Sequence, residues 1–283
     1  MVGLGNMGTP MSSKLLEAGY QVVGFDLSSE AKNRLTHAGG ISCDTVTGVA
    51  DCDVIILMLP SSEVVEAVLL KQGLAEVLAE GTVLVDMSSS RPMKTQEFAA
   101  ILAAKGITLI DAPVSGGVKG AQSGRLSVMA GGDGGVVDAL RPVLEVFGTV
   151  THTGGVGSGH ALKALNNLLS AVHLYATSEA MLTGIEYGLD PEVMLAVINK
   201  SSGRSGSTEN KWPNFVLPET YNSGFSARLM FKDMRIAVDL SHQLGMSSDL
   251  GDKAVALWEA AVENLPEAAD HTEIARWLKA SLD

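Results

Sequence analysis

Two polar side chains, Lys163 and Asn167, stand near the start of a long apolar run in the middle of the sequence. If the run is helical, their i, i+4 spacing places both side chains on one face of the helix. A lysine on a helix is usually a solvated surface charge. The residues around Lys163 are mostly alanine and leucine, however, and a helix that is apolar on every side is buried. Because a buried lysine changes its protonation state readily, the spacing predicts proton transfer by Lys163, assisted by the Asn167 amide.

A second pattern lies at the start of the chain, where residues 3–8 read Gly-Leu-Gly-Asn-Met-Gly. Between a strand and a helix, such glycines allow a tight turn, close approach of the backbone to a pyrophosphate, and close helix–strand packing. The pyrophosphate would lie at the helix N-terminus, where free N–H groups favour an anion. The motif alone is a weak signal, but a helical pattern and a second strand follow it here. It predicts a dinucleotide site at Gly3, Leu4, Gly5, Asn6, Met7 and Gly8.

The second strand pattern, residues 21–26, ends in Asp26 at the position of a ribose-binding acid. A carboxylate accepts hydrogen bonds from a ribose 2′-hydroxyl and repels a 2′-phosphate. No arginine is adjacent to Asp26, and Arg34 is further along the next helical pattern. We therefore expect NAD to be preferred over NADP. The alternative is that Asp26 only caps the end of the strand.

Two further groups of residues are ambiguous by themselves. Ser115, Gly116 and Gly117 follow a strand pattern, and their successive N–H groups with the serine hydroxyl can cradle a carboxylate. An ordinary turn with glycines for steric reasons is the simpler interpretation of these residues alone. Lys232 and Asp233 lie on a later helical pattern, where a surface ion pair is the simplest explanation.

The order of the elements predicts the fold class. Strand and helix patterns alternate through residues 1–153, which indicates a parallel-rich sheet covered on both faces, a Rossmann domain. Helical patterns without strands follow. We expect an α/β Rossmann domain, then an all-α C-terminal domain joined to it by a long interdomain helix. The predicted division is 1–153 for the dinucleotide domain, 154–188 for the hinge and long helix, and 189–283 for the helical domain, whose last helix spans 272–282.

Composition excludes several classes of function. The chain has 283 residues, 46% of them hydrophobic, which suffices for a large core. A formal net charge of -12 opposes binding to nucleic acid or to an anionic membrane surface. Two cysteines, no signal peptide and no apolar segment of membrane-spanning length indicate a cytoplasmic protein. No histidine has metal-ligand spacing, so we expect no metal. Only Met1 and Val2 precede the first glycine, and we expect a few residues of the first strand to be missing.

Together, four motifs resemble the β-hydroxyacid dehydrogenase family, which includes 3-hydroxyisobutyrate dehydrogenase and tartronate semialdehyde reductase. The motifs are residues 3–11, 111–124 and 157–167 and the pair Lys232–Asp233, in that order over almost the full length. The resemblance implies a dinucleotide-dependent oxidation of a small 3-hydroxy acid by a homodimer or homotetramer. It also implies roles for single residues: catalysis by Lys163 with Asn167, substrate binding by Ser115, Gly116, Gly117 and Lys232, and further cofactor contacts by Leu59, Pro60, Ser89, Lys232 and Asp233.

The resemblance leaves substrate identity open. After Ser205, close relatives often carry a bulky aromatic residue where this chain has Gly206, in a stretch near the pocket mouth of the family. Two alternatives remain: an NADPH-dependent imine or 3-oxo reductase of the same fold, and a non-catalytic dinucleotide-binding protein. A cation at Lys163 would repel an iminium, and a non-catalytic protein would have no need of Lys163 or Asn167.

Overall fold

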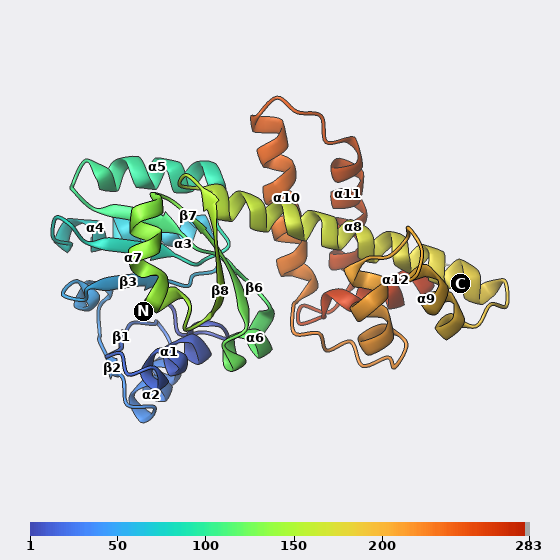
Figure 1. The fold of residues 1–283 in the computed structure, drawn as a ribbon, viewed down its shortest axis with the longest axis horizontal. Helices are drawn as coiled ribbons and strands as arrows, with labels where there is room; N and C mark the ends of the chain where they lie inside the picture. Colours follow the sequence, from blue (N-terminus) through green and yellow to red (C-terminus); the bar gives the residue numbers. More distant parts are fainter. Residues whose placement is uncertain (281–283) are drawn as a thin grey trace. The chain divides into compact units, whose positions relative to one another are not determined.

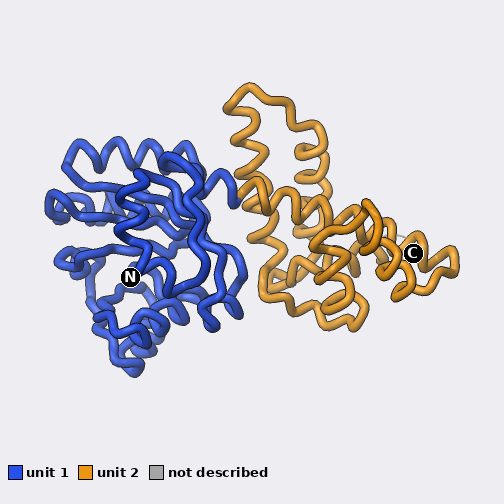
Figure 2. Tube along the Cα trace, viewed as in Figure 1, with its two compact units in different colours: residues 1–163 blue, residues 164–283 orange. Residues whose placement is uncertain are grey.

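The structure, a computed structural model, describes residues 1–280 of the chain. It contains two compact units, residues 1–163 and residues 164–283 (Figure 2). This boundary lies inside the predicted long helix, and the predicted three-part division at residues 153 and 188 stays a prediction. The predicted end of the last helix, at Leu282, lies outside the described residues.

A six-stranded sheet forms the centre of the first unit (Figure 1). Its strand order is β3-β4-β5-β7-β6, with β8 beside β7. The first three strands are parallel to one another; β7 is antiparallel to β5 and β6 and parallel to β8. The strands are β3 (Val54–Leu57), β4 (Val83–Asp86), β5 (Thr108–Asp111), β6 (Val114–Ser115), β7 (Leu126–Gly131) and β8 (Gly148–Gly154).

The N-terminal strands are shorter than predicted. β1 (Val23–Gly24) and β2 (Ile41–Ser42) form a separate parallel pair, and the predicted strand 21–26 keeps only two residues in regular pairing. Val2 bridges in parallel to both Phe25 and Leu57 and so lies between β1 and β3. The chain turns at Gly3 directly afterwards, which leaves few backbone groups for further pairing.

Helices cover both faces of the sheet, because alternate residues of each strand point to opposite sides. Ile56, Val85 and Ile110 pack with the helices of one face, which are α1 (Gly8–Glu17), α2 (Ser29–His37), α6 (Gly117–Ser123) and α7 (Gly134–Leu144). Ile55, Leu84 and Leu109 pack on the other face, against α3 (Ser62–Glu66), the π-helix Ala67–Lys71, α4 (Leu74–Val77), α5 (Pro92–Ala103) and the 3₁₀ turn Val46–Val49. The predicted doubly covered, parallel-rich sheet is confirmed.

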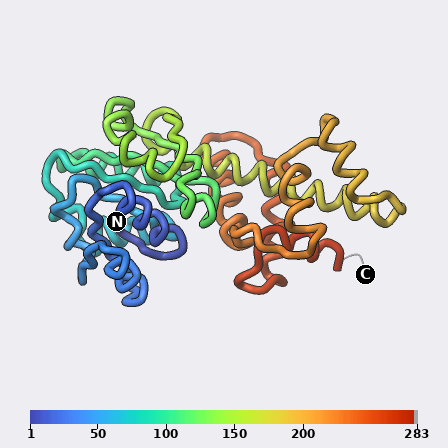
Figure 3. The backbone as a smooth tube through the Cα atoms, turned by 60° about the horizontal axis from the view of Figure 1, so that its bottom comes forward, coloured from blue at the N-terminus to red at the C-terminus, as the bar shows by residue number. Residues whose placement is uncertain are grey.

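The long helix α8 (Ser158–Glu186) begins in the first unit and continues into the second. Further helices complete the second unit, and residues 164–280 contain no regular strand, as predicted. Trp212 and Trp258 are almost fully buried in its core. The helices α10 (Ala227–Gln243) and α11 (Asp249–Asn264) pack against each other, and their backbones are drawn in orange to red in Figure 3. The helices are α9 (Pro191–Ile198), the π-helix Ser207–Val216, α10 (Ala227–Gln243), α11 (Asp249–Asn264), the 3₁₀ turn His271–Glu273 and α12 (Ile274–Ala280).

The short helix α4, the helices α6 and α7, and the π-helix 207–216 were not predicted from the sequence. α6 and α7 carry glycines in their first turns, which lower intrinsic helix propensity. The π-helix 207–216 contains Pro213, which normally argues against a helix interior. In each case packing of the apolar face outweighs the local preference.

Candidate active site

The glycine-rich turn has the steric features that a dinucleotide requires. Gly3 has a φ of +93°, and a Cβ added to Gly3 or Gly8 would collide with the carbonyl oxygens of Met58 and Gly3, respectively. Gly5 differs, because a Cβ there would meet no atom within 4 Å. The N-terminus of α1 receives no hydrogen bond from the side chain of Met7. The middle of the turn is therefore open and faces uncapped helix amides, which fits a pyrophosphate.

The carboxylate of Asp26 joins the glycine turn to the start of the next helix. The backbone N–H of Leu4 donates to Oδ2 at 2.7 Å, and that of Ser28 donates to Oδ1 at 2.8 Å. Ser28 in turn caps α2 by accepting from the N–H of Ala31. The bond from the Ser28 N–H to Asp26 is of the kind expected for the strand-end cap considered as the alternative. A carboxylate has about four acceptor sites, so capacity for a ribose hydroxyl remains.

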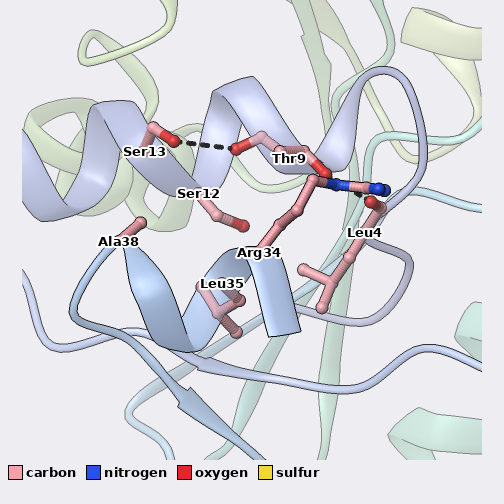
Figure 4. A pocket seen from close by; sticks show the side chains of 7 residues that line it. All are labelled: Leu4, Thr9, Ser12, Ser13, Arg34, Leu35 and Ala38. Carbon is pink, nitrogen blue, oxygen red and sulfur yellow. Dashed lines mark hydrogen bonds between the residues drawn. The ribbon is translucent and has the colours of Figure 1, made fainter. Parts of the chain in front are cut away.

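Arg34 lies closer to the turn than its sequence position indicates. Figure 4 shows its guanidinium beside Leu4 and Thr9, at a small cavity between α1 and α2. Its Nη1 donates to Glu30 at 2.7 Å. Ser12 also lines the cavity, and its hydroxyl is buried without a hydrogen-bond partner. No arginine is adjacent to Asp26 in the sequence, but α2 brings Arg34 to the glycine turn, where Glu30 is its carboxylate partner.

The predicted cofactor residues after β3 and β4 lie in loops that are joined by Ser88. The N–H of Leu59 donates to Ser88 Oγ at 2.9 Å. Asp86, which ends β4, accepts from the N–H of Ser88 and from the hydroxyl of Ser90. Pro60 is exposed and Ser89 half-buried in the same two loops. Ser88 was not predicted; the alternation of Asp86, Ser88 and Ser90 was its only signal.

Ser115, Gly116 and Gly117 form the turn between β6 and α6. Ser115 pairs with Ser127 on β7. The φ angles of Gly116 and Gly117 are +126° and +61°, which residues with a side chain rarely adopt. The two glycines are thus explained by backbone geometry, and a carboxylate cradle stays a prediction.

Lys163 lies directly beside this turn. It is only 8% exposed, and its Nζ donates to the carbonyl oxygen of Val114 at 2.9 Å. The predicted burial is correct, but the reason given for it is wrong, because one face of α8 is open: Leu162, Leu165 and Leu169 are 44%, 41% and 58% exposed. The lysine is buried because its side chain extends to β6.

The first turn of α8 is fixed by Asp111, the last residue of β5. Its Oδ1 accepts from the N–H of Gly157 at 2.6 Å and its Oδ2 from that of His160 at 2.8 Å. Burial raises the pKa of the Asp111 carboxyl, while His160 and both amide hydrogen bonds oppose the shift. This capping role was not predicted, and it anchors the helix that carries Lys163.

Asn167, Lys232 and Asp233 form a separate cluster in the second unit. The Asn167 amide donates to Asp233 Oδ2 at 2.7 Å, and both side chains are buried. Lys232 Nζ lies 3.7 Å from Asp233 Oδ1. The pair is therefore not the surface ion pair that the sequence alone suggests, since its carboxylate is held against α8. Lys163 and Asn167 occur four residues apart on α8, as predicted.

Two absences are found in the described part of the chain. Residues 1–280 contain no group of three or more His, Cys, Asp or Glu side chains placed to hold a metal ion. No helix among these residues is long and apolar enough to cross a membrane.

Comparisons with known proteins identify the family. Residues 1–155 match the NAD-binding domain of 6-phosphogluconate dehydrogenase, and residues 157–278 match the NAD-binding domain of NADP-dependent 3-hydroxyisobutyrate dehydrogenase. The 3-hydroxyisobutyrate dehydrogenase of Pseudomonas aeruginosa is 39% identical over 260 residues, which cover 88% of this chain and 87% of that protein. The chain belongs to the β-hydroxyacid dehydrogenase family.

Two further relatives match this chain over nearly its whole length. The NAD-dependent L-serine dehydrogenase of P. aeruginosa is 36% identical over 266 residues, covering 91% of this chain and 89% of that protein. The solved structure of Mycobacterium tuberculosis 3-hydroxyisobutyrate dehydrogenase with L-serine has a TM-score of 0.92 and 32% identity, covering 98% and 97% of the two chains.

The predicted family, fold and enzyme class are confirmed. The chain is an NAD(P)-dependent oxidoreductase that acts on a CH–OH group. Similarity to dehydrogenases of this kind favours hydroxyl oxidation over imine reduction and over a non-catalytic role. The roles of single residues stay predictions.

Proposed function

We propose that this β-hydroxyacid dehydrogenase reversibly oxidises the hydroxyl group of a short 3-hydroxy acid, with NAD as its preferred dinucleotide. The observation that carries the proposal is the hydrogen bond from Lys163 Nζ to Val114 O at 2.9 Å. It holds a buried amine one residue from the turn at Ser115. A carboxylate bound at that turn would place its own β-hydroxyl within reach of the amine.

The dinucleotide would be held by the glycine turn and by the loops after β3 and β4. The pyrophosphate would bind the turn at residues 3–8, where Gly5 leaves open space. Leu59, Pro60 and Ser89 would contact the remainder. When bound, the nicotinamide supplies the hydride acceptor. The protein's residues supply orientation and proton transfer.

Two observations support NAD over NADP. Asp26 is fixed by two amide hydrogen bonds and presents a carboxylate toward the turn, where a 2′-phosphate would be repelled. Arg34 lines the small cavity beside the turn and forms an ion pair with Glu30, which partly neutralises the charge that would bind a 2′-phosphate.

The substrate carboxylate would be bound by the Ser115 hydroxyl and the amides of Gly116 and Gly117. Lys163 would accept the proton of the C3 hydroxyl during oxidation and return it during reduction. Asn167 would assist Lys163, and its own amide is oriented by Asp233.

We also propose a homodimer or homotetramer in the cytoplasm. The open face of α8, formed by Leu162, Leu165 and Leu169, supports association, since exposed apolar patches mark interfaces. Cys43 and Cys52 are both free thiols, which suits a reducing compartment.

A substrate panel with both cofactors tests the proposal. It should contain 3-hydroxyisobutyrate, L-serine and the methyl ester of 3-hydroxyisobutyrate, which lacks the carboxylate charge. We expect oxidation of at least one free acid with NAD and little oxidation of the ester. Equal rates for acid and ester would contradict carboxylate binding, and no oxidation of any 3-hydroxy acid would contradict the proposed activity.

A further inference from the structure

His160 is a buried side chain for which the proposed mechanism has no use. It is 1% exposed and lies in the first turn of α8, three residues before Lys163. Its ring contacts two elements far away in sequence. Nδ1 lies 2.8 Å from the hydroxyl of Thr95 on α5, and Nε2 lies 3.0 Å from the carbonyl oxygen of Ser88.

The partners of the ring determine where its proton is. The carbonyl oxygen of Ser88 can only accept, so Nε2 must carry a hydrogen. The Thr95 hydroxyl has a single hydrogen and also lies 3.2 Å from Arg91 O. When Nε2 carries the only ring hydrogen, Nδ1 is an acceptor and the Thr95 hydroxyl donates to it. A bond in the other direction would require a hydrogen on both ring nitrogens, and it would also retain the bond from Nε2 to Ser88 O.

No charged group replaces these partners. Asp86 Oδ2 lies 3.9 Å from Nε2, and Asp111 Oδ2 lies 3.7 Å from Nδ1. Both distances exceed those of a hydrogen bond. The ring orientation is therefore set by Thr95 and Ser88, while Asp111 fixes the His160 backbone.

Ser88 extends this connection to the loops that we assign to the dinucleotide. Its hydroxyl accepts from the N–H of Leu59, and Ser89 follows it in the chain. His160 thus connects α8, which carries Lys163, to Ser88, which contacts the Leu59 loop and belongs to the Ser89 loop. All these groups belong to the first unit.

We propose that His160 is a positioning residue: its Nε2–H group holds the Ser88 carbonyl and so keeps the Leu59 and Ser89 loops aligned with Lys163 for dinucleotide binding. This rests on the proposed function only in its assignment of Leu59 and Ser89 to the cofactor. Loss of the bond would leave a buried carbonyl group unsatisfied, and relaxation of the loop would follow.

Two substitutions of His160 distinguish the contributions of its two ring nitrogens. The amide nitrogen of His160→Gln can occupy about the position of Nε2 and still donate to Ser88 O. The shorter side chain of His160→Asn reaches only the position of Nδ1 and loses that bond. Thr95→Val is the matched control, because it removes the Nδ1 partner and leaves the Nε2–H group. For each protein, the measurements are the NADH dissociation constant by fluorescence titration, kcat and KM for NAD, and the melting temperature.

We expect His160→Asn to weaken NADH binding and to raise the KM for NAD by about tenfold. The KM should change more than kcat. His160→Gln and Thr95→Val should bind NADH nearly as tightly as the wild-type protein, although Thr95→Val also loses stability.

Two results would overturn the inference. The first is equal NADH affinity in the asparagine and glutamine variants, whether or not it is weakened relative to the wild type. The second is a weakening by Thr95→Val as large as that by His160→Asn. The proposed function fails separately, if wild-type protein binds NADH but oxidises no 3-hydroxy acid. In that case, the NADH titrations still decide the role of His160.

Discussion

The two units hold their proposed site residues by different kinds of contact. In the first unit the contacts involve the backbone: Leu4 N–H with Asp26, Leu59 N–H with Ser88, and Lys163 with Val114 O. In the second unit the contacts join side chains, as in Asn167 with Asp233. Backbone-held groups keep their position as long as the sheet and its turns are formed. Groups held by side chains depend on individual partners, so single substitutions should disturb them more selectively.

The largest effect should follow loss of the amine at the turn. Lys163→Ala should lower kcat by about 10²- to 10⁴-fold, the usual contribution of one acid–base group. NADH affinity should hardly change, because the glycine turn and Asp26 do not depend on Lys163. Lys163→Arg should be little better, since a guanidinium retains its proton. Lys105→Ala, which removes an exposed partner of Glu76, is the control in steady-state assays. A kcat of Lys163→Ala near that of the wild type would contradict the proposed mechanism.

What could be predicted from the sequence depends on how far apart in the chain the contacting residues lie. The glycine turn, the strands and the 163/167 spacing depend on local patterns, and the structure contains each of them. The contacts of Ser88 and Asp111 with His160 join positions 72 and 49 residues apart, and no local spacing encodes them. The position of Arg34 beside Leu4 depends on how α2 packs against α1. The open face of α8 was mistaken for a buried one because leucines are frequent on both kinds of surface.

The second largest effect concerns the stability of the second unit, where the proposed site residues are held by side-chain contacts. Burial, and then the charge of Lys211, lower the pKa of His271 from 6.5 to about 4. Its Nδ1 lies 3.0 Å from Phe225 O, and its Nε2 is buried without a partner. Below pH 6.5 His271 is protonated in the unfolded chain, whereas in the folded chain it stays neutral until about pH 4. Stability is therefore full above pH 6.5 and falls between these two values, by about 3 kcal/mol in total.

Denaturant unfolding at pH 7.5 and pH 5 measures the part of this loss that occurs above pH 5. His271→Gln should reduce the difference between the two pH values. His173→Gln should retain it, because His173 is exposed on α8. Identical pH dependence in all three proteins would show that His271 is not the responsible group.

The next effect concerns the cofactor and returns to the backbone-held unit. NAD should be used with a kcat/KM about tenfold above that for NADP, which corresponds to about 1.4 kcal/mol. Asp26→Ser should narrow this ratio, because a hydroxyl does not repel a 2′-phosphate. Arg34→Ala is the informative companion: because Glu30 already neutralises part of the guanidinium charge, the ratio should change less than in Asp26→Ser. Equal use of both dinucleotides by the wild-type enzyme would remove the argument from Asp26.

The smallest effect is expected at the turn after β6. Ser115→Ala should raise the KM for a 3-hydroxy acid by roughly fivefold and change kcat less, because a carboxylate is bound in the ground state and the transition state alike. Ser127→Ala, the cross-strand partner, provides the control in the same kinetic assay. An unchanged KM would favour the simpler interpretation, in which Gly116 and Gly117 only permit the turn.

The central claim is that Lys163 exchanges the proton of the substrate hydroxyl, and single-turnover hydride transfer measured against pH tests it most directly. Enzyme saturated with NAD is mixed with the best substrate of the panel, and NADH formation is followed for the wild type and Lys163→Ala. The oxidation rate of the wild type should rise with pH through one ionisation, as Lys163 loses its proton and becomes a base. The alanine variant should be slower and should lack that ionisation. The same pH-dependent rise in both proteins would assign proton transfer to another group and contradict the proposed mechanism.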